Sequence, residues 1–105
     1  MPIVEFSGKR FQTDESGFLE NYENWCDEWV EWVKQDEGIT ELTDEHWAVM
    51  NVIREYFERN GIAPMIRVLS KRTGLPKERF WELWRSGPGD GACKMAGLSK
   101  PAGCV

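Results

Sequence analysis

The sequence contains no long apolar run and no signal for export. Among its 105 residues, no stretch approaches the roughly 20 apolar residues that a helix needs to cross a bilayer. Residues 1–5, Met-Pro-Ile-Val-Glu, lack the basic and apolar regions of a secretory signal peptide. We therefore expect a cytoplasmic protein with no membrane insertion.

Basic charge and histidine are also scarce. Lys and Arg number 13 against 18 Asp and Glu, a net charge of −5, whereas a nucleic-acid binder normally presents a basic face to phosphate. Residues 67–85 form a local basic island that could dock a partner, but the overall balance indicates no nucleic-acid partner. The single histidine, His46, has no second His or Cys at ligand spacing, which favours a surface or capping role over a metal site.

The cysteines are too few, and odd in number, for a framework of structural disulfides. Three are present, and a reducing cytoplasm keeps thiols reduced unless they cycle in a reaction. Their presence therefore indicates catalysis, sulfur handling or packing. Cys26 lies beside Trp25 in an aromatic-rich segment, where a small buried residue is the favoured interpretation over a reactive thiol.

The remaining composition indicates one mainly helical domain. Hydrophobic residues make up 41% and charged residues 30% of the chain, which is typical of a soluble globular protein with a single core. The predicted fold is a small orthogonal helical bundle with an N-terminal β-hairpin, a helix-turn-helix-like pair and a flexible C-terminal arm. The hairpin is expected over residues 3–13, packed on the helices through Val4, Phe6 and Phe11.

The first two helices are predicted from apolar residues at helical spacing and from their end signals. Asn24 is the expected N-cap of a helix over about 25–36, which Gly38 ends. Thr43 is the expected N-cap of the longest helix, over about 44–59. Its wide apolar stripe predicts a central helix that is touched on more than one side.

Two shorter helices are predicted next, from Ile62 to about Thr73, with Pro64 in the first turn, and from Lys77 to Trp84. Two short helices joined by a Gly-containing turn make a helix-turn-helix shape. We favour a packing role over DNA binding, because the aromatic residues of the last helix are needed for the core. The alternative, from another functional class, is a helix-turn-helix regulator whose cysteines sense redox state.

The last twenty residues, 86–105, contain so many Gly and Pro that we expect no helix or strand to run through them. The sequence thus predicts a folded body over 1–85 and an arm over 86–105 that places Cys93 and Cys104 where the chain is accessible. Eighteen residues of flexible arm reach about 20 to 25 Å. The two thiols can meet at small entropic cost, so a disulfide, or a bridge with an extra sulfur, is within reach.

Residues 87–105, Gly-Pro-Gly-Asp-Gly-Ala-Cys-Lys-Met-Ala-Gly-Leu-Ser-Lys-Pro-Ala-Gly-Cys-Val, resemble the C-terminal signature of the DsrC family, the sulfur carriers associated with dissimilatory sulfite reductase. The resemblance extends to residues 24–29 and 60–67, and it departs from the family pattern at Asp90, Ser99 and Ala102. None of these departures removes a thiol.

This resemblance implies a protein cosubstrate rather than a complete enzyme, with no cofactor of its own. Cys104 would take up sulfur as a persulfide or at the sirohaem of the sulfite reductase alpha and beta subunits. Cys93 would then resolve it into a trisulfide or disulfide, which places the chain with DsrC proper, because the related TusE proteins keep only the penultimate cysteine. Arg67 and Lys100 would hold Cys104 as thiolate or steer an anionic sulfur species.

The resemblance also implies two kinds of further partner. In sulfite reduction, a membrane-bound DsrMKJOP-type reductase complex would return the dithiol and release sulfide. In oxidative sulfur metabolism, sulfurtransferases of the TusA or DsrEFH type would deliver a persulfide to the same carrier. The sequence leaves the direction of sulfur flux open.

Overall fold

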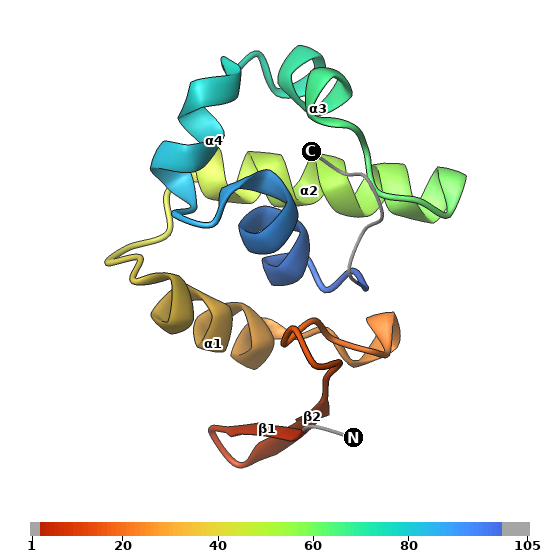
Figure 1. The fold of residues 1–105 in the computed structure, drawn as a ribbon, viewed down its shortest axis with the longest axis vertical. Helices are drawn as coiled ribbons and strands as arrows, with labels where there is room; N and C mark the ends of the chain where they lie inside the picture. The colour runs from red at the N-terminus through yellow and green to blue at the C-terminus, as the bar shows by residue number, and fades with distance from the viewer. Residues whose placement is uncertain (1–2, 100–105) are drawn as a thin grey trace.

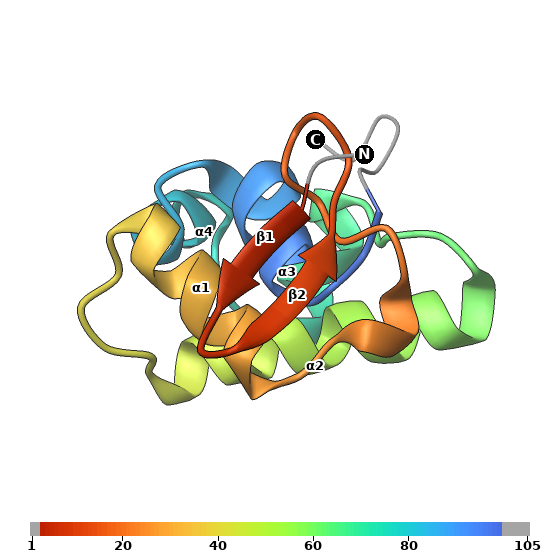
Figure 2. The same ribbon diagram turned by 90° about the horizontal axis from the view of Figure 1, so that it is seen from below.

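A two-stranded antiparallel hairpin begins the part of the chain that the computed structural model describes, residues 3–99. Strands β1 (Ile3–Phe6) and β2 (Lys9–Gln12) pair with Val4 opposite Phe11. Ser7 and Gly8 join them, and both have positive φ, as a two-residue hairpin turn requires. Phe11 is buried against Trp29, with ring centroids 5.3 Å apart, and Val4 also packs on the core. The predicted hairpin is confirmed (Figures 1 and 2).

Helix α1 (Asp27–Glu37) follows a 3-10 turn, η1 (Tyr22–Asn24), and ends at Gly38 as predicted. The prediction that Asn24 is its N-cap is wrong, because Asn24 completes the preceding turn. Cys26 occupies the cap position instead, with an extended backbone and no side-chain capping bond. Helix α1 therefore begins two residues later than expected.

Helix α2 (Asp44–Asn60) is the longest helix and begins at Thr43 as predicted. Thr43 and His46 form a reciprocal capping box, in which the backbone N–H of Thr43 donates to His46 Nδ1 over 3.0 Å. The capping role of His46 is confirmed, but a surface position is wrong: its ring is buried, and Nε2 donates to the carbonyl oxygen of Leu83 over 3.0 Å. This residue thus joins the start of α2 to Leu83, the last residue of the fourth α-helix.

Helices α3 (Ile66–Thr73) and α4 (Lys77–Leu83) form the expected pair around Gly74. Helix α3 begins four residues later than predicted, since Met65 is its N-cap and Pro64 lies in the preceding loop. Arg79 of α4 forms ion pairs with Glu45 of α2 and with Glu82. Figure 1 shows α3 and α4 on one side of α2, and α1 on the other.

A further helical segment, η2 (Pro88–Cys93), runs between α1 and α2 and is drawn blue in Figure 1. The prediction that no helix passes through residues 86–105 is therefore wrong for this segment. Gly and Pro lower helix propensity, but helices in proteins gain most of their stability from packing. The segment and the residues after it bury five core side chains: Ala92, Cys93, Met95, Ala96 and Leu98.

The core accordingly extends from the hairpin to Leu98 rather than ending before residue 86. It gathers side chains from every helix, and its largest fully buried members include Trp29, Trp84 and Phe80. The predicted mainly helical fold with an N-terminal hairpin is confirmed. No helix within residues 3–99 is long and apolar enough to span a membrane.

Candidate functional site

Cys93 lies at the end of η2 inside the core, and its side chain and backbone are only 1% exposed. The prediction that this cysteine is accessible on an arm is therefore wrong for this structure. Burial of a small thiol among apolar neighbours outweighs the low helix propensity of the surrounding sequence. Cys104 and Lys100, the other predicted tail residues, lie outside the described residues.

The chain just after Cys93 is held by three hydrogen bonds to consecutive backbone carbonyls. Trp29 Nε1 donates to the Lys94 carbonyl over 2.8 Å, and Trp25 Nε1 donates to the Met95 carbonyl over 2.9 Å. Arg54 Nη1 donates to the Ala96 carbonyl over 2.7 Å. Carbonyls at the end of a helix lack partners within the helix, and side-chain donors of this kind satisfy them. The Lys94 carbonyl also accepts from the backbone N–H of Gly97 over 3.0 Å. We call Trp25, Trp29 and Arg54 the carbonyl clamp.

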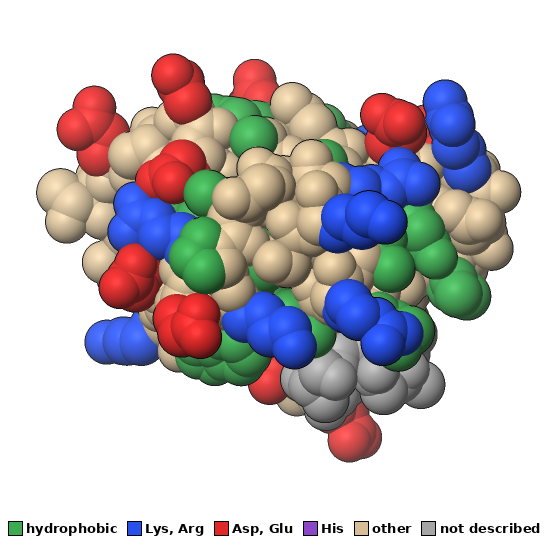
Figure 3. Space-filling view, turned by 90° about the horizontal axis from the view of Figure 1, so that it is seen from above, with side chains coloured by type: hydrophobic (Ala, Val, Ile, Leu, Met, Phe, Trp, Pro, Cys, Tyr) green, Lys and Arg blue, Asp and Glu red, His purple; other side chains and the backbone are tan. Residues whose placement is uncertain are grey.

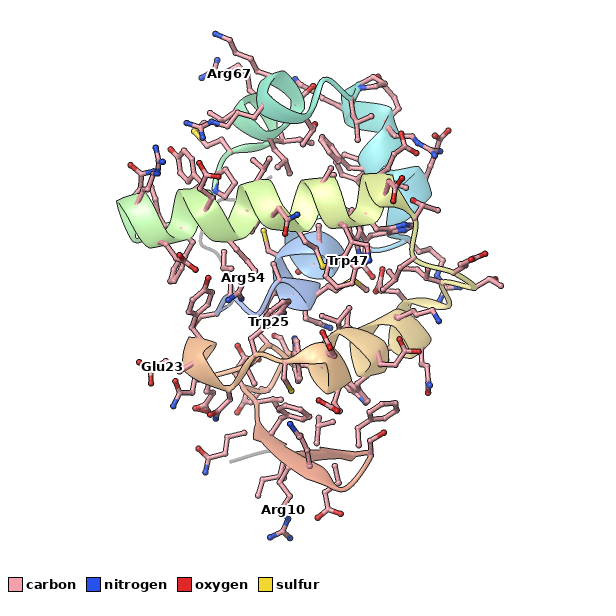
Figure 4. All side chains as sticks on the ribbon, turned by 180° about the vertical axis from the view of Figure 1, so that it is seen from behind. Arg10, Glu23, Trp25, Trp47, Arg54 and Arg67 are labelled. Atoms are coloured by element: carbon pink, nitrogen blue, oxygen red, sulfur yellow. The ribbon has the colours of Figure 1, made fainter. Side chains whose placement is uncertain are left out.

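Arg54 is fixed in this position by two aromatic rings. Its guanidinium carbon lies 3.8 Å from the Trp25 ring centroid and 4.3 Å from that of Tyr22. Tyr22 Oη donates to Glu58 Oε2 over 2.7 Å. Burial raises the pKa of Tyr22 to about 12, with a further contribution from this hydrogen bond. Figure 4 shows Arg54 and Trp25 side by side below α2.

Glycines of the tail allow tryptophan side chains to approach the backbone closely. A Cβ at Gly97, where φ is +88°, would lie 2.6 Å from Trp25 Cδ1. A Cβ at Gly91 would lie 2.6 Å from Trp84 Cβ. Only glycine fits at such distances. The glycines that predicted a loose arm instead allow the tryptophan side chains to pack directly against the tail backbone.

The beginning of the tail is held at the C-terminal end of α1. The backbone N–H of Ser86 donates to Glu37 Oε1 over 2.9 Å, and its hydroxyl donates to Glu37 Oε2 over 2.7 Å. Lys94 extends toward α1 as well, with Nζ 3.9 Å from Asp36 Oδ2 and 5.3 Å from the Phe18 ring centroid. Residues 86–98 are thus fixed at both ends.

Arg67, the predicted anion-steering residue, is exposed in the first turn of α3. In Figure 4 it points outward on the side of α2 opposite Arg54. The structure therefore does not bring Arg67 to the carbonyl clamp. No local pattern marks Trp25, Trp29 and Arg54 as site residues, because they lie 42 to 70 positions from the carbonyls that they bind. The glycines at 91 and 97 were the available signal of close packing.

Cys26 is half-buried at the start of α1, beside the ion pair of Lys9 and Glu28, whose atoms Nζ and Oε1 lie 3.3 Å apart. The hydrogen bond from Lys9 to Glu28 raises the pKa of Lys9, with the neighbouring thiol contributing. This position is consistent with packing, although burial is less complete than expected. Within residues 3–99, no three His, Cys, Asp or Glu side chains gather closely enough to hold a metal ion.

Basic, acidic and apolar side chains share the face over α3 and α4 (Figure 3). Exposed cations on α3 are Arg67, Lys71 and Arg72, and Met65 just before the helix is 54% exposed. These three cations belong to the basic island of residues 67–85, for which the sequence predicts a local docking surface.

Comparison with known proteins gives full-length matches. The family model described as "DsrC like protein" matches residues 5–105. The chain is 51% identical to the sulfite reductase, dissimilatory-type subunit gamma, of Nitratidesulfovibrio vulgaris, over 100% of both chains. It is 33% identical to the sulfurtransferase TusE of Escherichia coli, over 98% of this chain and 100% of that protein.

Solved structures give the same result. The crystal structure of dissimilatory sulfite reductase I matches with a TM-score of 0.93 and 50% identity, covering 99% of this chain and 100% of the other. The oxidized gamma subunit of dissimilatory sulfite reductase from Archaeoglobus fulgidus matches with a TM-score of 0.85 and 38% identity, with the same coverage.

Proposed function

The chain belongs to the DsrC family, and from this membership we propose that it is a cytoplasmic sulfur carrier and the protein cosubstrate of a dissimilatory sulfite reductase. The observation that carries the proposal is the match to a sulfite reductase gamma subunit over the whole of both chains. The carrier has no cofactor of its own, because the sirohaem at which it acts belongs to the alpha and beta subunits of the reductase.

Cys104 receives the sulfur and Cys93 resolves it. Sulfite, two electrons from the reductase and four protons react with the two thiols to give a Cys93–Cys104 trisulfide and three water molecules. Four electrons and four protons from a membrane-bound DsrMKJOP-type complex then restore both thiols and release sulfide. Arg67 and Lys100 are our candidates for steering the anionic sulfur species or holding Cys104 as thiolate.

Mass spectrometry after sulfite turnover with the reductase tests these roles. We expect a species with one added sulfur that links Cys93 to Cys104, and we expect Cys93→Ala or Cys104→Ala to abolish it. Cys26→Ala is the matched control and keeps the species. Accumulation of the bridged species in Cys93→Ala, or labelling of Cys26, contradicts the proposed roles.

The match to TusE sulfurtransferases favours a second candidate, in which the same carrier relays persulfide in the oxidative direction. A persulfide on a sulfurtransferase of the TusA or DsrEFH type would pass its outer sulfur to Cys104, and the donor would recover its thiol. Incubation with such a loaded donor, followed by peptide mapping, tests this. A persulfide on Cys104 supports the relay, and its absence with competent donor restricts the carrier to sulfite reduction.

A further inference from the structure

We propose that the exposed side of helix α3 docks the carrier on an acidic surface of the sulfite reductase. Arg67, Lys71 and Arg72 meet carboxylates of the partner, and Met65 packs beside them. We call these four residues the α3 face. The inference rests on the proposed function, because the reductase is the partner that this function assigns.

The first support is that the cations of the α3 face have no acidic partner in the described chain. Within residues 3–99, seven Lys and Arg side chains lie at most 4.0 Å from a carboxylate: Lys9, Arg10, Lys34, Arg54, Arg59, Arg79 and Lys94. The remaining cations of this part of the chain form no such pair, and all of them fall within the basic island: Arg67, Lys71, Arg72, Lys77 and Arg85. The basic charge that the fold leaves without an acidic neighbour is therefore gathered in one region.

The second support is that Arg67 lies where a cation destabilises its own helix. It is in the first turn of α3, at the positive end of the helix dipole, and Lys71 follows one turn later on the same side. Helix α3 has no acidic residue to offset either charge, whereas α1, α2 and α4 each have at least one in the first turn. Folding alone therefore does not account for Arg67, and an acidic partner would relieve the repulsion.

The third support is the exposure and the mixed chemistry of the α3 face. Its three cations are exposed, Met65 is 54% exposed, and Arg67 points outward in Figure 4. Arg72 is held in part by α2, since its guanidinium carbon lies 5.4 Å from the Tyr56 ring centroid. Arg and Met are enriched at protein–protein interfaces, and a preorganised guanidinium loses less freedom when it binds a carboxylate.

Two other anionic partners, duplex DNA and a lipid bilayer, fit the surface less well. In helix-turn-helix recognition the second helix enters the major groove. Here that helix, α4, exposes Glu78 and Glu82, and its Arg79 already pairs with Glu45 and Glu82. DNA and a bilayer are also extended anionic surfaces, and residues 1–45 contain 13 acidic but only three basic residues. An acidic patch of limited size on a protein can contact the α3 face without approaching this acidic part of the chain.

Calorimetric titration of the full chain into the alpha–beta sulfite reductase, under reducing conditions, tests the docking. Because salt screens exposed charges, Kd should rise between about 50 and about 300 mM salt. Arg67→Glu should raise Kd about fivefold or more at the lower salt, since an ion pair is lost and a like charge takes its place. The same substitution should keep or raise the thermal midpoint, because an acid in the first turn favours the dipole and can pair with Lys71. A merely structural role of Arg67 would not weaken binding while stability is kept.

Arg10→Glu is the matched control, because it makes the same change of charge at an exposed residue of the hairpin. Figure 4 shows Arg10 and Arg67 at opposite ends of the molecule. Its Kd should stay within about twofold of the unaltered chain's, since charges beyond the screening length interact weakly. A second variant, Lys71→Gln with Arg72→Gln, should make Kd less dependent on salt. Unaltered binding by Arg67→Glu, or equal weakening by Arg10→Glu, overturns the inference.

The docking and the proposed function fail in different ways. If the unaltered chain does not bind the reductase at either salt concentration, both the cosubstrate role and the docking are contradicted. If it binds and the Arg67→Glu chain binds equally well, only the α3 face is wrong. Binding to phosphatidylglycerol vesicles or duplex DNA that depends on Arg67 and is tighter than binding to the reductase also overturns the choice of partner.

Discussion

At the scale of single residues, Gly97 is constrained by both its backbone and its neighbour. Its φ is +88°, and a Cβ there would meet Trp25 at 2.6 Å. Gly97→Ala should therefore cost more than the roughly 1 to 2 kcal/mol of a left-handed alanine, because Trp25 must also move. Urea unfolding of this variant measures the loss.

Gly74→Ala is the control for Gly97→Ala. Gly74 has φ +75°, and a Cβ there would meet no heavy atom within 4 Å, so the alanine incurs the backbone cost alone. Equal losses of unfolding free energy in the two variants would show that the Trp25 contact is not tight.

Tyr22, which stacks on Arg54, should titrate abnormally because its hydroxyl is partly buried. Its pKa is raised to about 12 from an ordinary value near 10, mainly by burial. Between these values the unfolded chain loses the tyrosine proton before the folded chain does, so stability falls as pH rises through this window. Ultraviolet titration of tyrosinate in Tyr56→Phe should show the raised pKa; ordinary titration near pH 10 in the folded protein would contradict it.

At the scale of secondary-structure elements, Glu37 joins the end of α1 to the beginning of the tail. It accepts two hydrogen bonds from Ser86 and is only 6% exposed. Glu37→Ala should lower the free energy of unfolding by about 1 to 3 kcal/mol, since hydrogen bonds to a charged group are lost. Thermal and urea unfolding measure this, and Glu31→Ala on the same helix, which removes only a half-exposed pair with Lys34, should have little effect. Similar losses in both variants would contradict the role of Glu37.

The elements that could be predicted from the sequence are those whose ends are set by local chemistry. Ser7-Gly8 sets the hairpin turn, the Thr43 capping box begins α2, and Gly74 separates α3 from α4. The N-cap of α1 and the helix η2 could not be predicted in this way. Helix η2 depends on burial against α2 and α4, which outweighs a local sequence rich in Gly and Pro.

The candidate site, too, could be predicted from the sequence only in part. The sequence singled out Cys93 through its spacing from Cys104 and a family signature, but it did not reveal that Cys93 is buried. In the sequence, nothing distinguishes Arg54 from an ordinary cation in the middle of a long helix. Its contact with the Ala96 carbonyl, 42 residues away, exists only after the tail has folded back between α1 and α2.

At the scale of the whole molecule, the tail is divided at Leu98 between core and predicted arm, and truncation can test this. A chain that ends at Ser99 keeps every described core residue, so we expect a cooperative thermal transition within a few degrees of the full chain's.

A chain that ends at Ser86 loses five buried side chains: Ala92, Cys93, Met95, Ala96 and Leu98. Each large apolar side chain lost from a core costs about 2 to 5 kcal/mol, and a domain of this size is stable by only about 5 to 15 kcal/mol. The shorter chain should therefore show no cooperative transition by circular dichroism. A cooperative transition near that of the full chain would mean that residues 87–98 are dispensable for folding, and the whole tail could then move as an arm.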